Sequence, residues 1–162
     1  MKRKQIGRKA LVLAAAAVSL AQAGSALGLE YTWNFNGSDN WSTTTRWTSL
    51  GGTYPNAQGD VVKLTFDIEN STRTVTIDVA DAKLGSLEIG DTDDNQSYVI
   101  AAAVGNSLII DNGASTASIV QTATSNADTK SAPITLNTDL NISNMHATNT
   151  LTISGPITTA SS

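Results

Sequence analysis

Apolar and polar residues alternate along most of the chain after about residue 30. In the stretch YTWNF, the apolar side chains of Tyr31, Trp33 and Phe35 fall on one side and Thr32 and Asn34 on the other, and VVKLTFDI and TRTVTIDV follow the same pattern. Alternation with a period of two is typical of β-strands. No stretch of ten or more residues has the apolar spacing of an amphipathic helix. The pattern therefore predicts an all-β protein.

A short Leu-x-Ile unit recurs between small or polar residues, as expected of a short strand with two inward side chains that ends in a turn. Its clearest copies are GSLEIG, NSLIIDNG, TDLNIS and NTLTISG, separated by 21, 32 and 11 residues, with TVTID and PITL as variants. This irregular spacing favours the turns of a right-handed parallel β-helix, a solenoid, with loops of variable length. An antiparallel β-sandwich also contains many short strands and is the alternative.

One turn of such a solenoid cannot be stable alone. Two buried aliphatic side chains contribute roughly 1.5 to 3 kcal/mol each, whereas ordering the backbone costs about 1 to 2 kcal/mol for every residue. Stacked turns cover one another, so we expect several of them. The segment ASTASIVQTATSNADTKSAP, residues 114–133, is rich in Ala, Ser and Thr. It contains one weak strand, SIV, and we otherwise predict a long loop or a poorly formed turn there, and the most disorder.

The first residues have the composition of a secretory signal peptide. Five basic residues precede a short apolar run and then small residues, and residues 1–23 are expected to be removed after Ala23, with Ala26 as the other candidate. The apolar run is too short for a membrane span. The rest has five basic residues against fourteen acidic ones, a net charge of −9, and no cysteine. This balance gives no footprint for nucleic acid, and the absence of cysteine excludes thiol and zinc-cysteine chemistry.

All three tryptophans, Trp33, Trp41 and Trp47, lie just before the first repeated strand. The open end of a β-helix exposes apolar side chains and unpaired strand edges. Large aromatic rings suit a cover for that end, so we predict an aromatic N-terminal cap in residues 24–66 and β-helix turns in residues 67–162. The alternative is an exposed sugar-stacking surface that binds envelope or extracellular polysaccharide.

Candidate chemistry is sparse. Asp91, Asp93 and Asn95 match the first three positions of a calcium loop, but the Gly and Glu that such a loop needs later are replaced by Gln96 and Ala102. We therefore interpret GDTDDNQ as a solvated turn and predict no metal and no cofactor. The single histidine, His146, lies in a polar turn without an evident nucleophile, so we predict no catalytic residue and no enzyme activity.

The landmarks of the chain resemble the N-terminal region of exported bacterial proteins with autotransporter-associated β-strand repeats, of the kind often carrying exosortase-type sorting tags. The resemblance covers about residues 31–157, and its landmarks are Trp33, Asn40-Trp41, Trp47, Pro55, Gly59-Asp60 with Val62, Phe66, TVTID and LGSLEIG. It implies a long β-helical passenger without demonstrated catalysis. Members continue through many Gly-rich repeats that LTISGPITTASS resembles, so a segment truncated at the C-terminus is expected.

These observations predict a non-catalytic protein that is secreted or displayed at the bacterial cell surface, with a structural, display or adhesion role. The alternative is a carbohydrate-binding module or the non-catalytic start of a polysaccharide-degrading enzyme.

Overall fold

The computed structural model of the chain describes residues 28–160, in which the regular structure is fifteen short strands and one turn of 3-10 helix, η1 (Thr44–Arg46). The predicted signal peptide, residues 1–23 with cleavage after Ala23, lies outside the described residues. No helix within residues 28–160 is long and apolar enough to cross a membrane. The all-β prediction is confirmed.

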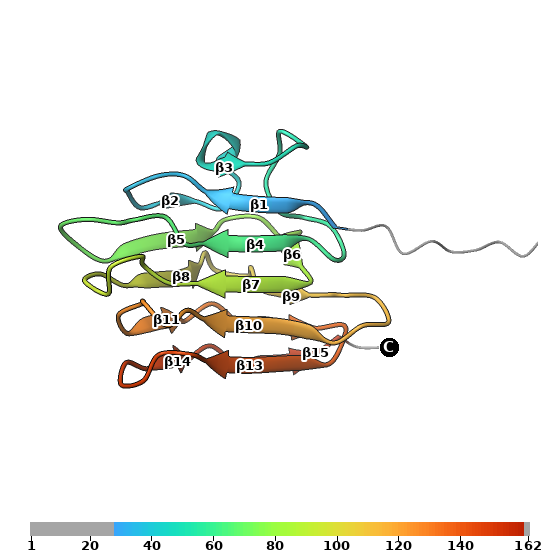
Figure 1. The fold of residues 1–162 in the computed structure, drawn as a ribbon. Coiled ribbons are helices and arrows are strands. Elements are labelled where there is room, and N and C mark those ends of the chain that lie inside the picture. Colours follow the sequence, from blue (N-terminus) through green and yellow to red (C-terminus); the bar gives the residue numbers. More distant parts are fainter. Residues whose placement is uncertain (1–27, 161–162) are drawn as a thin grey trace, which may run out of the picture.

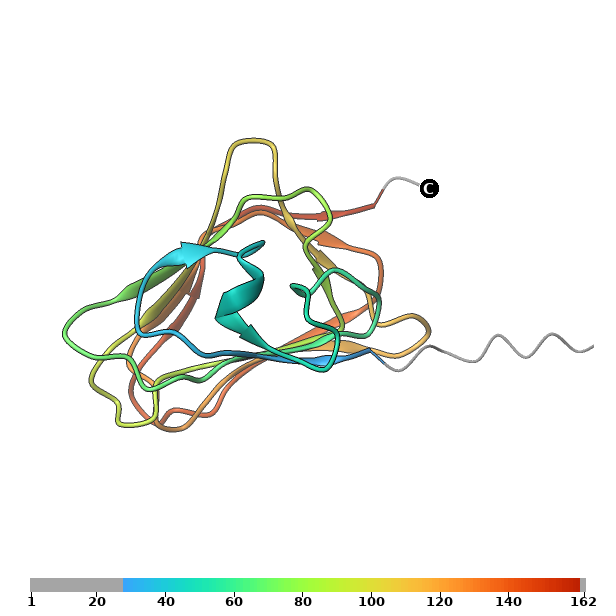
Figure 2. The ribbon, with the colours of Figure 1, turned by 90° about the horizontal axis from the view of Figure 1, so that it is seen from above.

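The strands form three sheets that lie around a common interior (Figures 1 and 2). Sheet A has six strands in the order β13, β10, β7, β4, β1, β3, with bounds Leu140–Asn144, Ala117–Gln121, Ser86–Ile89, Val61–Leu64, Glu30–Trp33 and Trp47–Thr48. Sheet B has five in the order β14, β11, β8, β5, β2, with bounds Leu151–Ile153, Asp128–Lys130, Tyr98–Ala102, Arg73–Ile77 and Asp39–Asn40. Sheet C has four in the order β15, β12, β9, β6, with bounds Ile157–Thr159, Ile134–Leu136, Leu108–Ile110 and Lys83–Leu84.

From β4 onward the chain visits sheets A, B and C in turn, and each strand from β4 to β12 is hydrogen-bonded to the strand three places later. We call each set of three consecutive strands a tier, so that β4–β6 form tier 2 and β13–β15 form tier 5. Tier 1 consists of β1, β2 and Asn56. Asn56 forms a single parallel bridge to Lys83 of β6 in tier 2. All strand pairs are parallel except β1 with β3. The antiparallel sandwich is therefore excluded.

The inward side chains form rows that cross the tiers. In sheet A the pairing places Tyr31, Val62, Leu87, Ile119 and Ile142 in one row, each beside the next. The first four members are buried and the last is 44% exposed. Because the alternation of each strand directs these side chains to the same face, stacking the tiers builds one continuous core.

The recurring Leu-x-Ile units are strands, but they are not equivalent turns. GSLEIG and TDLNIS lie in sheet A, NSLIIDNG in sheet C and NTLTISG in sheet B. Their spacing along the sequence is irregular because the units belong to three different sheets, and also because the loops differ in length.

The prediction of a long loop or a poorly formed turn in residues 114–133 is wrong, whereas the one strand expected there, SIV, lies within β10 (Ala117–Gln121). This segment contains β10, a five-residue strand between β7 and β13 in sheet A, and β11, between β8 and β14 in sheet B. Ile119 and Lys130 are fully buried. The weak local pattern of small polar residues is overridden because strands of tiers 3 and 5 pair with both edges of this segment.

Candidate functional site

The N-terminal end of the three sheets is covered by η1, β3 and the neighbouring loops (Figure 2). Beneath them Trp33 and Trp41 are 0% exposed and Trp47 is 5% exposed. The Trp47 ring lies 5.0 Å from both other indole rings, centroid to centroid, in edge-to-face geometry. Aromatic pairs in this arrangement add roughly 0.5 to 1.5 kcal/mol beyond the area they bury.

Each indole N–H in this cluster has an acceptor inside the protein. Trp33 Nε1 donates to the carbonyl of Phe35 at 2.8 Å, and Trp41 Nε1 to that of Pro55 at 2.8 Å. Trp47 Nε1 donates to the carbonyl of Trp41 at 2.7 Å. The faces of these rings are buried against one another, so a sugar cannot stack on them in this structure.

A partly exposed ion pair joins η1 to β2 at this end of the sheets. The guanidinium of Arg46 lies 2.7 Å from Asp39 and 3.7 Å above the centre of the Phe35 ring. Hydrogen bonds from Arg46, then from the Asn40 backbone, lower the pKa of Asp39. The outer edge strands β2 and β3 have only two residues each, which leaves a short edge for pairing with another chain.

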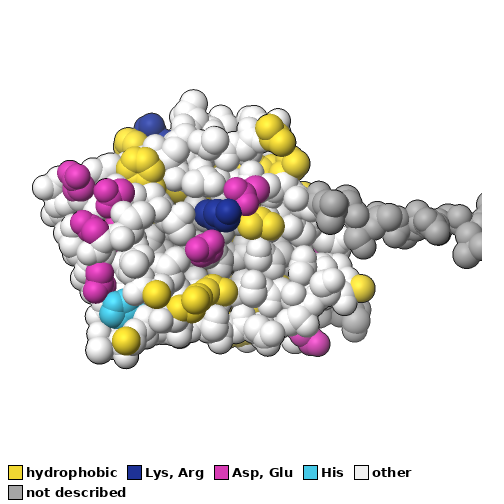
Figure 3. Space-filling view, in the orientation of Figure 1, with side chains coloured by type: hydrophobic (Ala, Val, Ile, Leu, Met, Phe, Trp, Pro, Cys, Tyr) yellow, Lys and Arg dark blue, Asp and Glu magenta, His cyan; other side chains and the backbone are white. Residues whose placement is uncertain are grey.

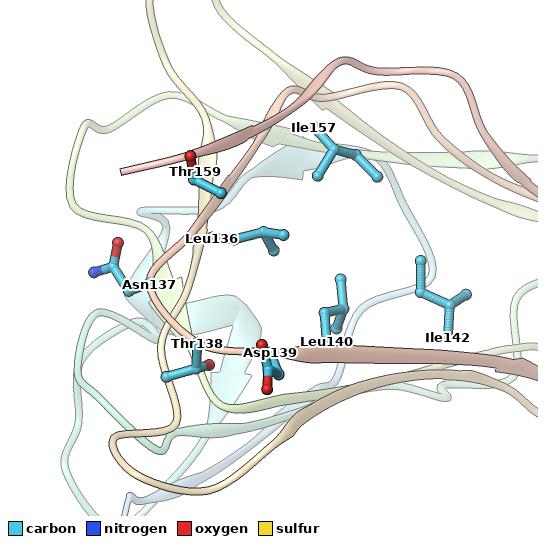
Figure 4. Close-up of a pocket in the computed structure, with 8 residues that line it drawn as sticks. All are labelled: Leu136, Asn137, Thr138, Asp139, Leu140, Ile142, Ile157 and Thr159. Carbon is cyan, nitrogen blue, oxygen red and sulfur yellow. The ribbon is translucent and has the colours of Figure 1, made fainter. Parts of the chain in front are cut away.

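The opposite end lacks such a cover among the described residues. Strands β13, β14 and β15 are the last members of sheets A, B and C. Leu136, Leu140, Ile142 and Ile157 point into a cavity of about 460 Å³ at this end (Figure 4). Ile142 and Ile157 are 44% and 48% exposed. These apolar side chains lie on the last described tier, so no described strand covers them.

Buried aspartates hold the corners between strands. Asp60, of the Gly59-Asp60 landmark, accepts the backbone N–H groups of Leu29, Asn56 and Ala57 at 2.9 to 3.1 Å. These bonds join the start of tier 1 to its end. The carboxylate therefore replaces strand partners that corner residues lack.

Asp91 plays the same part in tier 3, where it accepts the N–H groups of Ile68, Thr92 and Gln96 at 2.9 to 3.1 Å. Burial raises its pKa, against the effect of these bonds. One oxygen each of Asp67, Asp91 and Asp93 lies within 4.8 Å of the others. Asn95 instead donates both its backbone and side-chain N–H groups to Asp93. Two of the three predicted calcium-loop residues, Asp91 and Asp93, thus lie close together. Asp67, from the loop between β4 and β5, lies beside them.

Acidic side chains gather over the loops between sheets A and B, at the left of Figure 3, and the histidine lies beside one of them. The His146 Nε2 atom is 3.2 Å from Asp94, and its Nδ1 atom accepts the backbone N–H groups of Thr148 and Asn149. Asn149 also donates to Asp94 at 2.6 Å. The imidazole thus ties a tier 5 loop to a tier 3 loop, and none of its hydrogen bonds within the described residues involves a hydroxyl nucleophile.

The interior of tier 4 contains buried polar and charged side chains beside its apolar ones, which sequence reasoning missed. Lys130 is fully buried in a sheet B row between Ile100 and Ile153 and donates to the carbonyl of Ala132. Burial lowers the pKa of Lys130 to about 7. Asp128, also fully buried, accepts the N–H of Tyr98 at 2.7 Å and the hydroxyl of Ser125. Burial raises the pKa of Asp128 to about 6.

Gln121, in the sheet A part of the same tier, is fully buried as well, and its Oε1 atom has no hydrogen-bond partner. The alternation in TASIVQ and NADTKSA was the available signal, because Gln121, Asp128 and Lys130 fall on inward positions. This signal was weak because a strand with polar residues at its inward positions has the same composition as a loop.

No family model matches the chain, and neither a curated protein nor a solved structure shows significant similarity to it.

Proposed function

We propose that the chain is a segment of a right-handed parallel β-helix with an aromatic N-terminal cap, and that it is a non-catalytic secreted or cell-surface passenger. Its role is structural, for display or adhesion. The cyclic order of the three sheets supports the solenoid, because a chain that returns to the same sheet at every third strand coils around its interior. The burial of Trp33, Trp41 and Trp47 supports the cap.

The observation that carries the non-catalytic role is the use of the buried carboxylates. Asp60 and Asp91 each accept backbone N–H groups from more than one segment of the chain, and Asp128 accepts the backbone N–H of Tyr98 and the hydroxyl of Ser125. A carboxylate held in this way at a corner has its lone pairs directed at the backbone and not toward a cleft. These carboxylates therefore have a structural role, because they hold the backbone of the corners in place.

The solenoid leaves its loops free to vary, which suits display. In the β8–β9 loop, Val104 is fully exposed and Gly105 has a φ of +86° with open space around it. Loops of this kind tolerate insertions because no core residue depends on them.

Export and display are tested by inserting a short peptide epitope between Val104 and Gly105 in the full chain. An antibody should label intact expressing cells or the culture medium, and the exported protein should begin at Gly24 by mass spectrometry. Epitope that is detected only after cell lysis, on protein that retains Met1, would contradict the proposal. The matched control carries the epitope beside Trp41, inside the cap, where insertion should prevent folding.

A further inference from the structure

The side-chain oxygen of Asn36, in the loop between β1 and β2, accepts three hydrogen bonds. The backbone N–H of Glu69 donates to it at 3.0 Å, and Arg73 donates from Nε at 3.2 Å and from Nη2 at 3.0 Å. Two donors of one guanidinium directed at one group form the fork that fits a carboxylate. Position 36 thus carries a neutral amide where the surrounding donors suit an anion.

Arg73 has no carboxylate partner within residues 28–160. Its other hydrogen bonds go to neutral oxygen atoms, from Nη1 to the hydroxyl of Ser71 and from Nη2 to the backbone carbonyl of Glu69 at 2.6 Å. The ion pairs of the described residues are formed by Arg46, Lys63, Lys83 and His146. A negative oxygen at position 36 would therefore add the attraction of opposite charges to hydrogen bonds that already exist.

The residue after Asn36 is a glycine, which completes a reactive pair. A backbone nitrogen can attack the Cγ carbon of the preceding asparagine, and this attack is least hindered when the attacking residue has no side chain. A Cβ atom at Gly37 would lie 2.3 Å from the ring of Phe35, so a side chain here would displace that ring. Asn36 is exposed, and within the described residues neither its Nδ2 atom nor the N–H of Gly37 has a hydrogen-bond partner. The nucleophile and the leaving group are therefore both available.

We propose that Asn36 is a site of self-modification, at which the chain converts this asparagine into aspartate with water as the only reagent. The nitrogen of Gly37 gives its proton to water and bonds to Cγ of Asn36. The negative charge that forms on Oδ1 faces the donors of Glu69 and Arg73, which stabilise it. The bond from Cγ to Nδ2 then breaks, and this nitrogen takes up a proton and leaves as ammonia. The product is a succinimide ring.

Water opens the ring in the second step. Attack at Cγ breaks its bond to the nitrogen of Gly37, which takes up a proton, and leaves aspartate in an unchanged backbone. Attack at the other ring carbonyl leaves isoaspartate, with the chain running through Cγ. Because Arg73 polarises the Cγ carbonyl, the site favours aspartate. The new carboxylate pairs with Arg73 and joins the loop of tier 1 to β5 in tier 2.

A second Asn-Gly pair of the chain supplies a matched comparison, because it is held differently. Asn112 Nδ2 donates to the carbonyl of Thr116 at 2.9 Å, and the N–H of Gly113 donates to the carboxylate of Asp111 at 3.2 Å. The leaving group and the nucleophile are both occupied there, and no donor within the described residues bonds to Oδ1 of Asn112. Position 112 should therefore remain an amide while Asn36 of the same molecule reacts.

Peptide mapping by mass spectrometry measures both positions in one sample of the purified full chain at neutral pH, since replacing NH2 by OH adds about 1 Da. Asn36 should convert at least about tenfold faster than Asn112, and aspartate should exceed isoaspartate. In guanidinium chloride, where the chain is unfolded, the two rates should be alike and isoaspartate should dominate. Equal rates in the folded chain, or an Asn36 that reacts more slowly folded than unfolded, would overturn the proposal.

Two substitutions test the part played by Arg73. Arg73→Met removes the guanidinium and should slow the conversion of Asn36 at least about tenfold, whereas Arg73→Lys keeps the charge without the fork and should slow it less. Lys63→Met, at a lysine that makes no contact with Asn36, is the control and should leave the rate unchanged. A variant that fails to fold is recognised because Asn112 then reacts at its rate in guanidinium chloride. An unchanged Asn36 rate in folded Arg73→Met would overturn the proposal.

Discussion

The same rows of inward apolar side chains run between the two ends of the stacked tiers, but their first and last residues differ in exposure. In sheet A the row that begins at Tyr31 ends at Ile142; the tyrosine is 2% exposed and the isoleucine is 44% exposed. The difference comes from the cover, because Tyr31 lies edge-to-face with Trp47, whereas no described residue lies beyond Ile142 in this row. The comparison shows that burial in this fold depends on the neighbouring tier more than on the residue itself.

The largest effect is expected from opening the covered end. Trp41→Ala removes a fully buried indole and leaves Trp47 without one of its edge-to-face partners. We expect the free energy of unfolding to fall by about 3 to 5 kcal/mol, measured by chemical denaturation. Leu50→Ala, at an exposed residue of the same region, should change it by less than about 0.5 kcal/mol. A loss below about 1 kcal/mol for Trp41→Ala would show that the aromatic cover does not stabilise the stack.

The sheet A row allows a more direct comparison of the two environments, because it contains an isoleucine in tier 4 and another in tier 5. Ile119, in tier 4, is fully buried, and Ile142 is its paired neighbour in tier 5. Ile119→Ala should cost about 2 to 5 kcal/mol, whereas Ile142→Ala should cost about 1 kcal/mol or less. Equal costs in denaturant titrations would mean that tier 5 is covered in solution.

Lys130 offers a test of the tier beneath tier 5. Because burial lowers its pKa to about 7, the folded state binds fewer protons than the unfolded state between about pH 7 and the ordinary value of 10.5. Stability should therefore rise with pH through that window, while the cost of the buried charge is fully present below pH 7.

Lys130→Met should remove this alkaline rise and stabilise the protein at pH 6 by about 2 to 4 kcal/mol. Urea denaturation from pH 6 to 9.5 measures both effects. Lys63→Met, at a half-buried lysine paired with Glu30 at 2.7 Å, is the control and should keep the rise. An unchanged pH profile in Lys130→Met would show that the ammonium group is solvated in the folded state.

The smallest effect is expected at the contact that ties tier 5 back to tier 3. Asp94→Ala removes the carboxylate that faces His146 and accepts from Asn149. Since Asp94 is largely exposed, the loss of global stability should be within about 1 kcal/mol. Amide hydrogen exchange should nevertheless become faster in residues 145–150. Unchanged exchange would mean that the tier 5 loop is held by its own backbone contacts.

The strands were predictable from local alternation, as the positions of GSLEIG, NSLIIDNG, TDLNIS and NTLTISG show. The burial of the tryptophans followed from their position before the first repeat. The interior of tier 4 was not predictable, because a Lys at an inward position looks like a loop residue until strands on both sides are known to cover it. The role of Asp91 was hidden for the same reason, since its partner Ile68 lies in another tier.

By itself the sequence determined that this chain forms short strands, because the direction of successive side chains along a strand is a local property. Only the tertiary structure decided which strands share a sheet, that Lys130 and Asp128 lie inside, and that the tryptophans lie buried at the N-terminal end of the sheets. The physical reason is that these features depend on pairing between segments far apart in the chain. Such pairing satisfies backbone groups that any residue carries, so it leaves little trace in the composition of the segments it joins.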